Sequence, residues 1–477
     1  MVDVKKFRAV SGLIKKHKIE FVSLKFNDLF GRWIHFTIPV SRFTPGLFAE
    51  GIAYDGSSIA GFQSIEKSDM LLKPDIDTAF VDPVIEHPTL SVICNTVEPY
   101  TGEPYWRDPR HVALKTETYL KKQGIDAAYF GPEIEFFLFD DVRYKTGDNF
   151  GHWSIDVAEA NWHSDQGDVN LGRSVRKQEG YFVVPPFDHT IDLRLDMVKT
   201  LEKAGIAVER DTHERATAGS AEIDIHFDSL LRMADKINLF KYIVRNVAVK
   251  HGKSATFMPK PMFSHNGNGM HTHHSLWSKG KPMFADGKGS YHGLSQFALH
   301  YLAGVLTHAS SILAFAAPTV NSYRRLVPGY EAPTTIAFGA RNRSTAIRIP
   351  AYPDTASSRR IEFRAPDPSG NPYLWFSAMV LAGLDGVKKK LDPTKLGFGP
   401  FEKSGYEMSA EEIAKVRFTP GSLSDVLAAL DHDRQYLLGS GIFIDKLIDL
   451  WISEKKKEIA KTNLYPTPID FELYYDA

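Results

Sequence analysis

The residues best suited to chemistry in this sequence are carboxylates spaced as they would be on one face of a β-strand. In residues 131–139, Glu133 and Glu135 are two positions apart. Successive side chains of a strand point to opposite faces, so both carboxylates project from one face while Ile134 and Phe136 cover the other. Two glutamates side by side repel each other unless a cation is bound between them. On this strand alone, the spacing fits either a cation site or a polar face that meets solvent.

Three further stretches place acids, histidines or arginines on one strand face. They are Glu222, Asp224 and His226; His271 and His273; and Glu362 with Arg364. For any one of these strands, a polar face that merely meets solvent would also explain the pattern. Taken together, clustered carboxylates with one or two imidazoles form an oxygen-rich site suited to Mg²⁺ or Mn²⁺.

A second set of residues is cationic. Arg324 and Arg325 are adjacent, and Arg343 and Arg348 fall within residues 340–349. Arginine binds phosphate through two parallel N–H groups. Metal-binding acids together with arginines favour phosphoryl transfer by positioning and charge neutralisation, without a covalent nucleophile.

Motifs of other enzyme classes fail at a required position. Residues 252–254 end like a phosphate-binding P-loop, but Val247 stands where its first glycine belongs. His213 begins like a zinc-protease motif, but Thr217 replaces its second histidine. The single cysteine, Cys94, is interpreted as a buried strand residue.

Charge balance and apolar pattern argue against several classes of partner. The 477 residues carry 57 basic and 58 acidic side chains, so no long-range field favours nucleic acid or an anionic membrane. The N-terminus lacks the apolar run of a signal peptide. The most apolar stretch, 293–318, contains Gln296, His300 and His308 and is interpreted as a buried helix rather than a membrane span. We expect a cytoplasmic enzyme with no nucleic-acid and no membrane partner.

Periodicity predicts the elements that must hold these side chains. An amphipathic helix is expected over residues 3–18, strands over 19–26 and 31–38, and a loop rich in Gly and Ser over 51–69. A turn-rich linker suggests a domain boundary near residue 105, giving domains of residues 1–105 and 106–477. Helices are predicted in the second domain over residues 108–123, 190–204, 229–250, 291–316, 370–390, 422–438 and 441–460. Mixed strands and helices without a regular βαβ rhythm predict an α+β fold.

Seven short motifs occur in an order that resembles a known family along nearly the whole chain. They lie at residues 55–59 (DGSSI), 131–137 (GPEIEFF), 260–261 (KP), 266–271 (NGNGMH), 321–333 (NSYRRLVPGYEAP), 341–344 (RNRS) and 360–364 (RIEFR). Together they resemble type I glutamine synthetase, the bacterial class. The resemblance implies a small N-terminal β-grasp domain that completes the neighbouring subunit's active site. It also implies a large α+β catalytic domain built on an antiparallel sheet, in a homo-oligomer of two stacked hexameric rings.

The resemblance assigns metal ligands and nucleotide contacts. One divalent metal, beside the glutamate substrate, would be held by Glu135, Glu214 and Glu222. A second, against the ATP phosphates, would be held by Glu133, His271 and Glu362. Phosphate would be neutralised by Arg343 and Arg348. Four further residues would lie near the nucleotide: Glu209, His273, Ser275 and Arg360.

The resemblance also assigns the amino-acid and ammonium sites. Glutamate would be bound by Asn266, Gly267, Arg325 and Arg364. Ammonium would be held near Glu331 and Tyr181, with Asp55, Ser58 and Asp69 contributed by the neighbouring subunit. The implied reaction joins ammonia to L-glutamate through γ-glutamyl phosphate, giving L-glutamine, ADP and phosphate. Its catalytic residues would be Asp55, Glu331, Arg343 and Arg364, with Asp55 taking the proton from ammonium.

The insertion at residues 142–180 resembles the subclass regulated by adenylylation of a tyrosine. The matching tyrosine is Tyr406, although its flanks differ from the Asn-Leu-Tyr of that subclass. Membership of that subclass would bring nitrogen-regulatory proteins as partners.

Three alternatives to glutamine synthesis stay open. A related ligase could join glutamate to a larger amine, although Asp55, Asp69 and Glu331 form an intact ammonium set. A catalytically silent relative would have lost metal ligands, whereas all six positions are filled. A sensor that binds regulators is compatible with activity.

Overall fold

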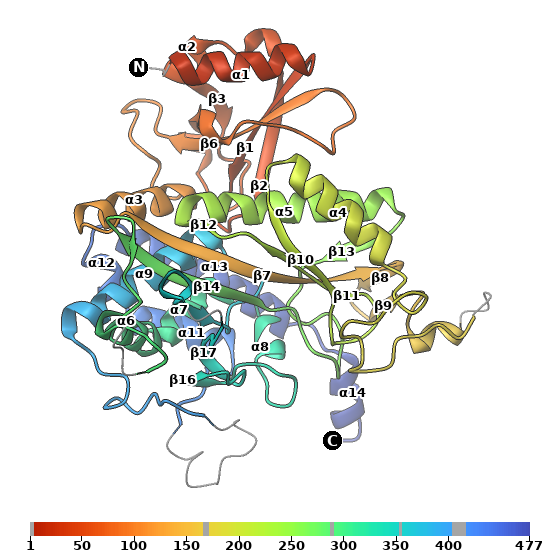
Figure 1. The fold of residues 1–477 in the computed structure, drawn as a ribbon. Coiled ribbons are helices and arrows are strands. Elements are labelled where there is room, and N and C mark those ends of the chain that lie inside the picture. The colour runs from red at the N-terminus through yellow and green to blue at the C-terminus, as the bar shows by residue number, and fades with distance from the viewer. Residues whose placement is uncertain (1–3, 166–170, 287–290, 353–354, 403–415) are drawn as a thin grey trace.

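The structure, a computed structural model, describes residues 4–165, 171–286, 291–352, 355–402 and 416–477. Two sheets organise it: a smaller one from the N-terminal residues and a larger one whose strands come from between residues 127 and 363. Figure 1 shows the N-terminal sheet on one side of the large sheet and α14 (Pro468–Tyr474) beyond the opposite side. The arrangement confirms the predicted α+β fold.

The N-terminal sheet has the strand order β2–β1–β6–β4–β3, with β5 beside β6. Its strands are β1 (Phe21–Asn27), β2 (Trp33–Pro39), β3 (Ile52–Asp55), β4 (Asp69–Pro74), β5 (Phe80–Val81) and β6 (Thr89–Val97). Strand β1 runs antiparallel to β2 and parallel to β6. Apolar side chains of β1 and β6 form a separate core with residues of α1 (Val4–Lys16) and α2 (Pro45–Glu50).

Part of the segment interpreted as a loop is a strand. Within residues 51–69, β3 pairs with β4 and sets Asp55 opposite Asp69. Strand β3 has only four residues, so its alternation of apolar and polar side chains is too short to stand out among the neighbouring Gly and Ser residues. Beyond β3 the expected turn is present, because Asp55 accepts hydrogen bonds from the Ser57 backbone N–H at 2.8 Å and the Ser58 hydroxyl at 3.2 Å.

The large sheet has the strand order β10–β11–β7–β14–β18–β17–β16. Its strands are β7 (Ala127–Phe139), β10 (Val208–His213), β11 (Ser220–Ile225), β14 (Met270–Ser278), β16 (Thr335–Ala340), β17 (Thr345–Ile349) and β18 (Ile361–Phe363). Short pairings are added by β12 (Asp228–Ser229), β13 (Ser254–Thr256) and β15 (Lys281–Pro282). Neighbours run antiparallel except β16 and β17, which are parallel. A separate hairpin is formed by β8 (Asp141–Thr146) and β9 (Gly151–Asp156).

Helices cover one face of the large sheet. Phe130 of β7 stacks on Phe376 of α9 (Pro372–Lys389) with ring centroids 4.0 Å apart, and Phe136 packs edge-on against Phe240 of α5 (Leu230–Lys250). The helices beyond the N-terminal sheet are α3 (Pro109–Lys122), α4 (Ile191–Lys203), α5 (Leu230–Lys250), α6 (Gln296–Thr307), α7 (Ala309–Ala316), α8 (Ser322–Arg325), α9 (Pro372–Lys389), α11 (Leu423–His432), α12 (Gln435–Leu438), α13 (Asp445–Asn463) and α14. Because this face is covered, the acids of β7 project from the other.

Two predicted helices are broken. The helix predicted over 291–316 is α6 followed by α7, bent by 70° at His308. The His308 ring lies 2.7 Å from Asp433 Oδ2 and 3.0 Å from Asp385 Oδ2, contacts that periodicity does not reveal. The helix predicted over 422–438 likewise divides into α11 and α12. No single helix in the described ranges is long and apolar enough to cross a membrane; the bent pair α6–α7 meets those criteria only jointly, by length and composition.

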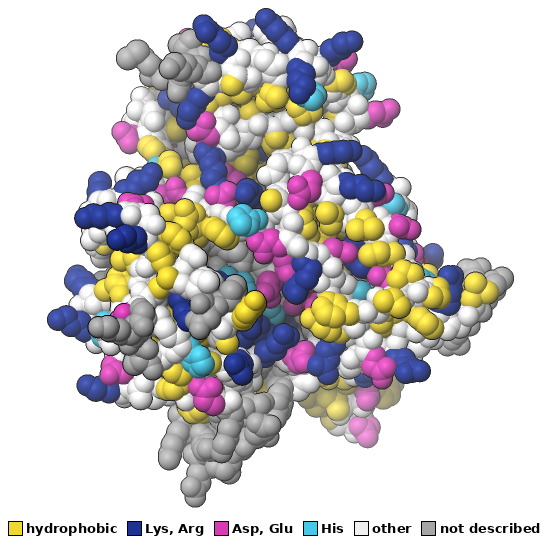
Figure 2. Space-filling model, in the orientation of Figure 1, with side chains coloured by type: hydrophobic (Ala, Val, Ile, Leu, Met, Phe, Trp, Pro, Cys, Tyr) yellow, Lys and Arg dark blue, Asp and Glu magenta, His cyan; other side chains and the backbone are white. Residues whose placement is uncertain are grey.

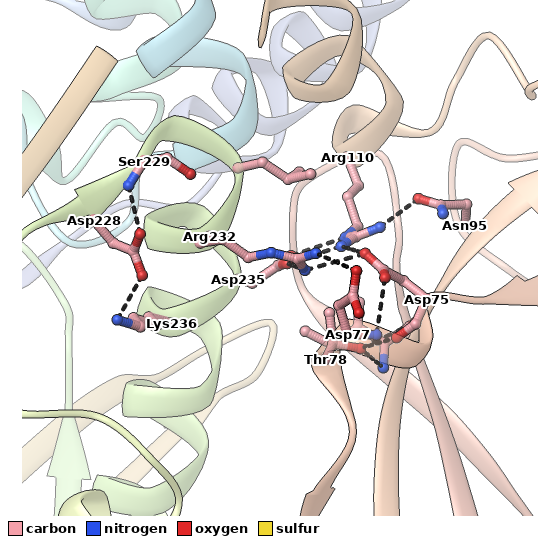
Figure 3. Close-up of polar contacts among 12 residues, drawn as sticks. Asp75, Asp77, Thr78, Asn95, Arg110, Asp228, Ser229, Arg232, Asp235 and Lys236 are labelled. Carbon is pink, nitrogen blue, oxygen red and sulfur yellow. Dashed lines mark hydrogen bonds and ion pairs between the residues drawn. The ribbon is translucent and has the colours of Figure 1, made fainter. Parts of the chain in front are cut away.

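A charged network around the buried Arg110 joins the N-terminal sheet to helices α3 and α5 (Figure 3). Arg110 of α3 donates to Asp235 of α5 at 2.9 and 2.8 Å, to Asp75 after β4 at 2.7 Å, and to Asn95 of β6 at 2.5 Å. Arg232 of α5 donates to Asp75 at 3.1 Å. Arg110 is only 1% exposed, and moving the N-terminal sheet away would remove its bonds to Asp75 and Asn95 and leave it paired with Asp235 alone. The network therefore fixes the orientation of the N-terminal sheet.

Candidate active site

The carboxylates of β7 lie on the sheet face that the helices leave open. Glu133 and Glu135 alternate along the strand with the completely buried Ile134 and Phe136. This alternation is the one that the sequence predicts. The apolar residues anchor β7 in the core and thereby hold the two acids in fixed positions.

Strand register brings acids from different segments together. Glu133 lies opposite Asp224 of β11 and His271 of β14, and Glu135 lies opposite Glu222 of β11. Directly opposed residues have Cβ atoms about 4.5–5.5 Å apart. Their side chains therefore share one small volume.

Across strands β14, β18 and β17, an acid lies between a histidine and an arginine. Glu362 of β18 lies opposite His273 of β14 and Arg348 of β17. Glu362 is completely buried and accepts hydrogen bonds from Arg348 and Arg364. The two guanidinium groups are thereby held at the edge of the acid cluster, where phosphate could bind them.

Most of these side chains border a cavity of about 190 Å³, but Asp224, His273 and Glu362 lie outside its lining. Thirteen of the residues that the resemblance assigns line it: Glu133, Glu135, Tyr181, Glu214, Glu222, Asn266, Gly267, His271, Arg325, Glu331, Arg343, Arg348 and Arg364. Figure 2 shows acidic, basic and histidine side chains adjoining one another near the middle of this face of the molecule. A cavity with both signs of charge suits a ligand that carries several charges of its own.

Burial and mutual repulsion raise the pKa values of several acids. Burial, reinforced by the charge of Glu214, raises the pKa of Glu135 to about 8. Burial, reinforced by the charge of Glu133, raises the pKa of Asp224 to about 7. Burial and the charge of Asp224 raise the pKa of Glu222 well above its ordinary value. A divalent cation would relieve this repulsion and displace the protons.

The pKa values of Glu133 and His271 are lowered, in contrast to those of the other acids. Although burial alone would raise it, the pKa of Glu133 is held well below its usual value by hydrogen bonds from His271 and His273. The His273 Nε2 atom lies 2.9 Å from Glu133 Oε1. Burial and then the charge of Arg364 lower the pKa of His271 to about 4, so this ring is neutral at pH 7, the form that ligates metals.

The donor set fits divalent cations. Two groups have ligand atoms that all lie within 4.8 Å of one another: Glu133, Glu222 and His271, and Glu133, His273 and Glu362. The Oδ1 atom of Asp224 is also buried without a hydrogen-bond partner in the described part of the chain. Carboxylate oxygens with an imidazole are ligands that Mg²⁺ and Mn²⁺ accept.

These groups differ from the ligand sets that the resemblance implies. Within the described ranges, Glu135 and Glu214 belong to neither group, and His273 takes the place expected for His271 beside Glu362. Glu135 accepts a hydrogen bond from the Gly269 backbone N–H at 2.6 Å. Glu135 and Glu214 nevertheless both line the cavity.

Four residues assigned to the nucleotide do not line the cavity: Glu209, His273, Ser275 and Arg360. Arg360 Nε donates to His273 Nδ1 at 3.1 Å, and His273 in turn contacts Glu133. Arg360 and His273 therefore extend the acid cluster along the sheet. Glu209 pairs with His226 at 2.8 Å on an exposed part of the surface.

The residues expected from a neighbouring subunit lie apart from this cavity. Asp55, Ser58 and Asp69 are exposed residues of the N-terminal sheet and its turn, and the cavity of their own chain is lined by others. Tyr406 lies outside the described residues.

Two arginines at the site have no role in the sequence analysis. Arg210 of β10 lies in register opposite Asp224 and pairs with it at 2.7 Å and with Glu222 at 3.2 Å. Arg215 pairs with Glu331. The pairing of β10 with β11 could have identified Arg210, because a position opposite an acid on the neighbouring strand favours a cation. No comparable sequence signal exists for Arg215, which lies in a turn.

Comparisons with known proteins cover nearly the whole chain. A family model described as the β-grasp domain of glutamine synthetase matches residues 18–99, and one described as its catalytic domain matches residues 106–474. Glutamine synthetase of Aquifex aeolicus (strain VF5) is 48% identical over 468 residues, covering 98% of each chain. That of Streptomyces coelicolor is 50% identical over 476 residues, covering 99% of this chain and 98% of the relative. A cryo-EM structure of Plasmodium falciparum glutamine synthetase superposes with a TM-score of 0.89 at 29% identity, covering 98% of each chain.

Proposed function

This chain belongs to the glutamine synthetase family, and we propose that the cavity described above carries out the family's reaction. It joins ammonia to the γ-carboxylate of L-glutamate at the expense of ATP, giving L-glutamine, ADP and phosphate. One observation carries the assignment of this site: buried acids with raised pKa values face Arg343, Arg348 and Arg364 across a single cavity. Such a site can hold cations and a polyphosphate together.

The first step turns a poor acyl electrophile into a good one. A carboxylate resists attack because its leaving group would be oxide. One γ-oxygen of glutamate therefore bonds to the γ-phosphorus of ATP, and the bond between that phosphorus and ADP breaks. Arg343 and Arg348 neutralise the phosphoryl oxygens as charge shifts toward ADP. Divalent cations held by the acid cluster, Mg²⁺ or Mn²⁺, supply further charge neutralisation when bound.

The second step needs free ammonia. Asn266 Oδ1 is buried without a hydrogen-bond partner in the described part of the chain, so it can accept a bond from the glutamate ammonium group. Asp55 of the neighbouring subunit takes a proton from ammonium beside Glu331 and Tyr181. Hydrogen bonds from Ser57 and Ser58 lower the pKa of Asp55, which keeps it an anion that attracts ammonium. Ammonia then attacks the γ-carbon, and the carbon–oxygen bond to phosphate breaks.

The proposal includes a shared site in a homo-oligomer. Residues 1–105 form the domain that completes the neighbour's site, and the subunits form two stacked hexameric rings. The support is that Asp55, Ser58 and Asp69 are exposed and lie outside the cavity of their own chain. Exposed acids outside their own cavity are free to meet the cavity of a neighbouring subunit.

The motifs further support a bacterial type I enzyme that works in the cytoplasm. The insertion at residues 142–180 supports the adenylylation-regulated subclass, with Tyr406 as the modified residue and nitrogen-regulatory proteins as partners. Intact-mass measurement on protein from nitrogen-rich source cells tests this. A nucleotide-sized mass increase that vanishes in Tyr406→Phe is the expected result, and an unmodified mass with the modifying enzyme present contradicts it.

Phosphate release and glutamine formation test the activity directly. We expect both to require glutamate, ATP, a divalent cation and ammonium, with glutamine identified by mass spectrometry. Polyamines in place of ammonium should give little product. A preference for the larger amine would indicate the related ligase, and phosphate release that needs no glutamate would contradict the assignment.

A further inference from the structure

Arg215 contacts two carboxylates of the candidate site at once. Its guanidinium pairs with Glu331, and its backbone N–H donates to Glu214 Oε2 at 2.8 Å. Both carboxylates line the cavity, but Arg215 does not belong to the described lining. Its guanidinium therefore holds Glu331 from outside the cavity and leaves the inside of the ammonium site open.

The segment that carries Glu331 forms one wall of the cavity, with Tyr330 and Ala332 also in the lining. The backbone of Glu331 is left-handed, with φ of 56°, a conformation that few residues other than glycine adopt. Three side-chain contacts hold this segment in place. Lys260 Nζ lies 4.0 Å from the Tyr330 ring centroid, Asn266 Nδ2 lies 3.4 Å from Glu331 Oε2, and Arg215 pairs with the other oxygen of Glu331.

Of these three contacts, the pair with Arg215 is the one that brings a full positive charge to the Glu331 carboxylate. The amide of Asn266 is neutral, and its distance is at the long end of the hydrogen-bond range. The charge of Glu331 also acts on Glu214, whose pKa is raised by burial and further raised by Glu331. Arg215 is thus placed to fix Glu331 relative to Glu214.

We propose that Arg215 is a positioning residue for the amine-acceptor step, acting through Glu331. This inference rests on the proposed function, which assigns Glu331 to ammonium. By holding Glu331 at the cavity wall, Arg215 keeps the ammonium site formed and shields γ-glutamyl phosphate from water. Without Arg215, ammonium binds more weakly and water attacks the γ-carbon in its place. That attack breaks the carbon–oxygen bond to phosphate and returns glutamate, phosphate and a proton.

The variant Arg215→Met keeps the apolar stem and removes the charge. Exposed ion pairs shift an equilibrium by up to about fivefold, so KM for ammonium should rise by about that factor. Phosphate release that requires glutamate but not ammonium should rise by a similar factor of about three to five. KM for ATP and glutamate should stay unchanged. Arg215→Lys, which restores a cation, should recover most of both effects.

A matched control removes an exposed ion pair elsewhere. Lys199 pairs with Asp196 at 3.2 Å on α4; the two acids, Asp196 and Glu331, are similarly exposed, and Lys199 is more exposed than Arg215. Lys199→Met should change neither KM for ammonium nor the ammonium-independent phosphate release. A change as large as that of Arg215→Met would mean that loss of any surface pair has this effect, and would overturn the inference.

A double variant tests whether Arg215 acts through Glu331. On a Glu331→Gln background, Arg215→Met should add nothing, because the carboxylate that it positions is gone. Additive effects on KM for ammonium would overturn the inference, as would an Arg215→Met enzyme with unchanged KM and unchanged phosphate release. A wild-type chain that forms no glutamine would instead contradict the proposed function, so the two failures are distinguishable.

Discussion

At the residue scale, the chemistry of the cavity depends on which carboxylates and imidazoles lie close enough to share one cation. Alternation in β7 places Glu133 and Glu135 on one face, and the structure confirms that placement. Which carboxylate joins which imidazole depends on register between strands and on side-chain rotamers, neither of which periodicity contains. The group of Glu133, His273 and Glu362 is therefore a finding of the structure.

Removing the Glu362 carboxylate should nearly abolish glutamine synthesis. Glu362→Ala leaves Arg348 and Arg364 without their shared partner and removes an acid that faces His273. Loss of electrostatic stabilisation of this kind commonly costs about 10²–10³ in kcat. Glu362→Gln, which keeps the shape but not the charge, should be similarly inactive while folding more readily. Near-normal turnover in either folded, assembled variant would argue against the assigned site.

The raised pKa values predict how the metal-free protein responds to pH. The pKa of Glu135 is raised from 4.5 to about 8 and that of Asp224 from 3.8 to about 7. The stability that each group contributes is fully present below its ordinary pKa and is lost as pH rises through its folded value. The unfolding temperature in a chelator should therefore fall between pH 5 and pH 8. Saturating Mg²⁺ should reduce that fall, and a chelated protein that gains stability over this range would contradict the account.

At the element scale, the strands that carry the charged side chains and most of the long helices could be predicted, whereas short or bent elements could not. Residues 229–250 were expected to form one helix, and α5 confirms it within one residue. The bend at His308 depends on contacts with Asp385 and Asp433, which lie far away in the sequence. Two short helices, α2 and α14, have no counterpart among the predicted helices. A signal for α14 exists, because Thr467 and Asp470 form a capping box at its start.

The contact between α6 and α9 depends on glycine, and this can be tested by substitution. A Cβ on Gly386 would lie 2.3 Å from the His300 carbonyl oxygen and 2.6 Å from Gly304 Cα. Gly386→Ala should therefore destabilise the protein by about 1–3 kcal/mol, the usual cost of overpacking. Denaturant unfolding at fixed protein concentration measures it. The control Gly12→Ala, in α1 with no atom within 4 Å, should stabilise by up to about 1 kcal/mol. Equal effects of the two substitutions would contradict the packing argument.

At the scale of the whole molecule, the charged network around Arg110 connects fold to function. Arg110 ties Asp75, next to the N-terminal sheet, to Asp235 of α5. The N-terminal sheet carries Asp55 and Asp69, so the network sets the direction in which these acids point. Sequence alone could not predict it, because its members come from segments up to 160 positions apart in the chain.

Mixed oligomers test whether Asp55 acts across a subunit boundary. Asp55→Ala and Arg343→Ala should each be inactive alone. Mixing them should restore part of the activity, because some boundaries then pair an intact N-terminal domain with an intact cavity. Glutamine formation after dissociation and reassembly measures this, with each variant reassembled alone as the control. No recovery in oligomers verified to contain both chains would contradict a shared site.

The central claim is that this cavity activates glutamate as an acyl phosphate, and the fate of the glutamate oxygens tests it most directly. The enzyme is given ATP, ammonium, a divalent cation and glutamate with both γ-oxygens labelled with oxygen-18. The account predicts one labelled oxygen in each phosphate released and the other in the amide of glutamine, because the oxygen that bonds to phosphorus departs with it. Unlabelled phosphate formed alongside glutamine would contradict activation through γ-glutamyl phosphate.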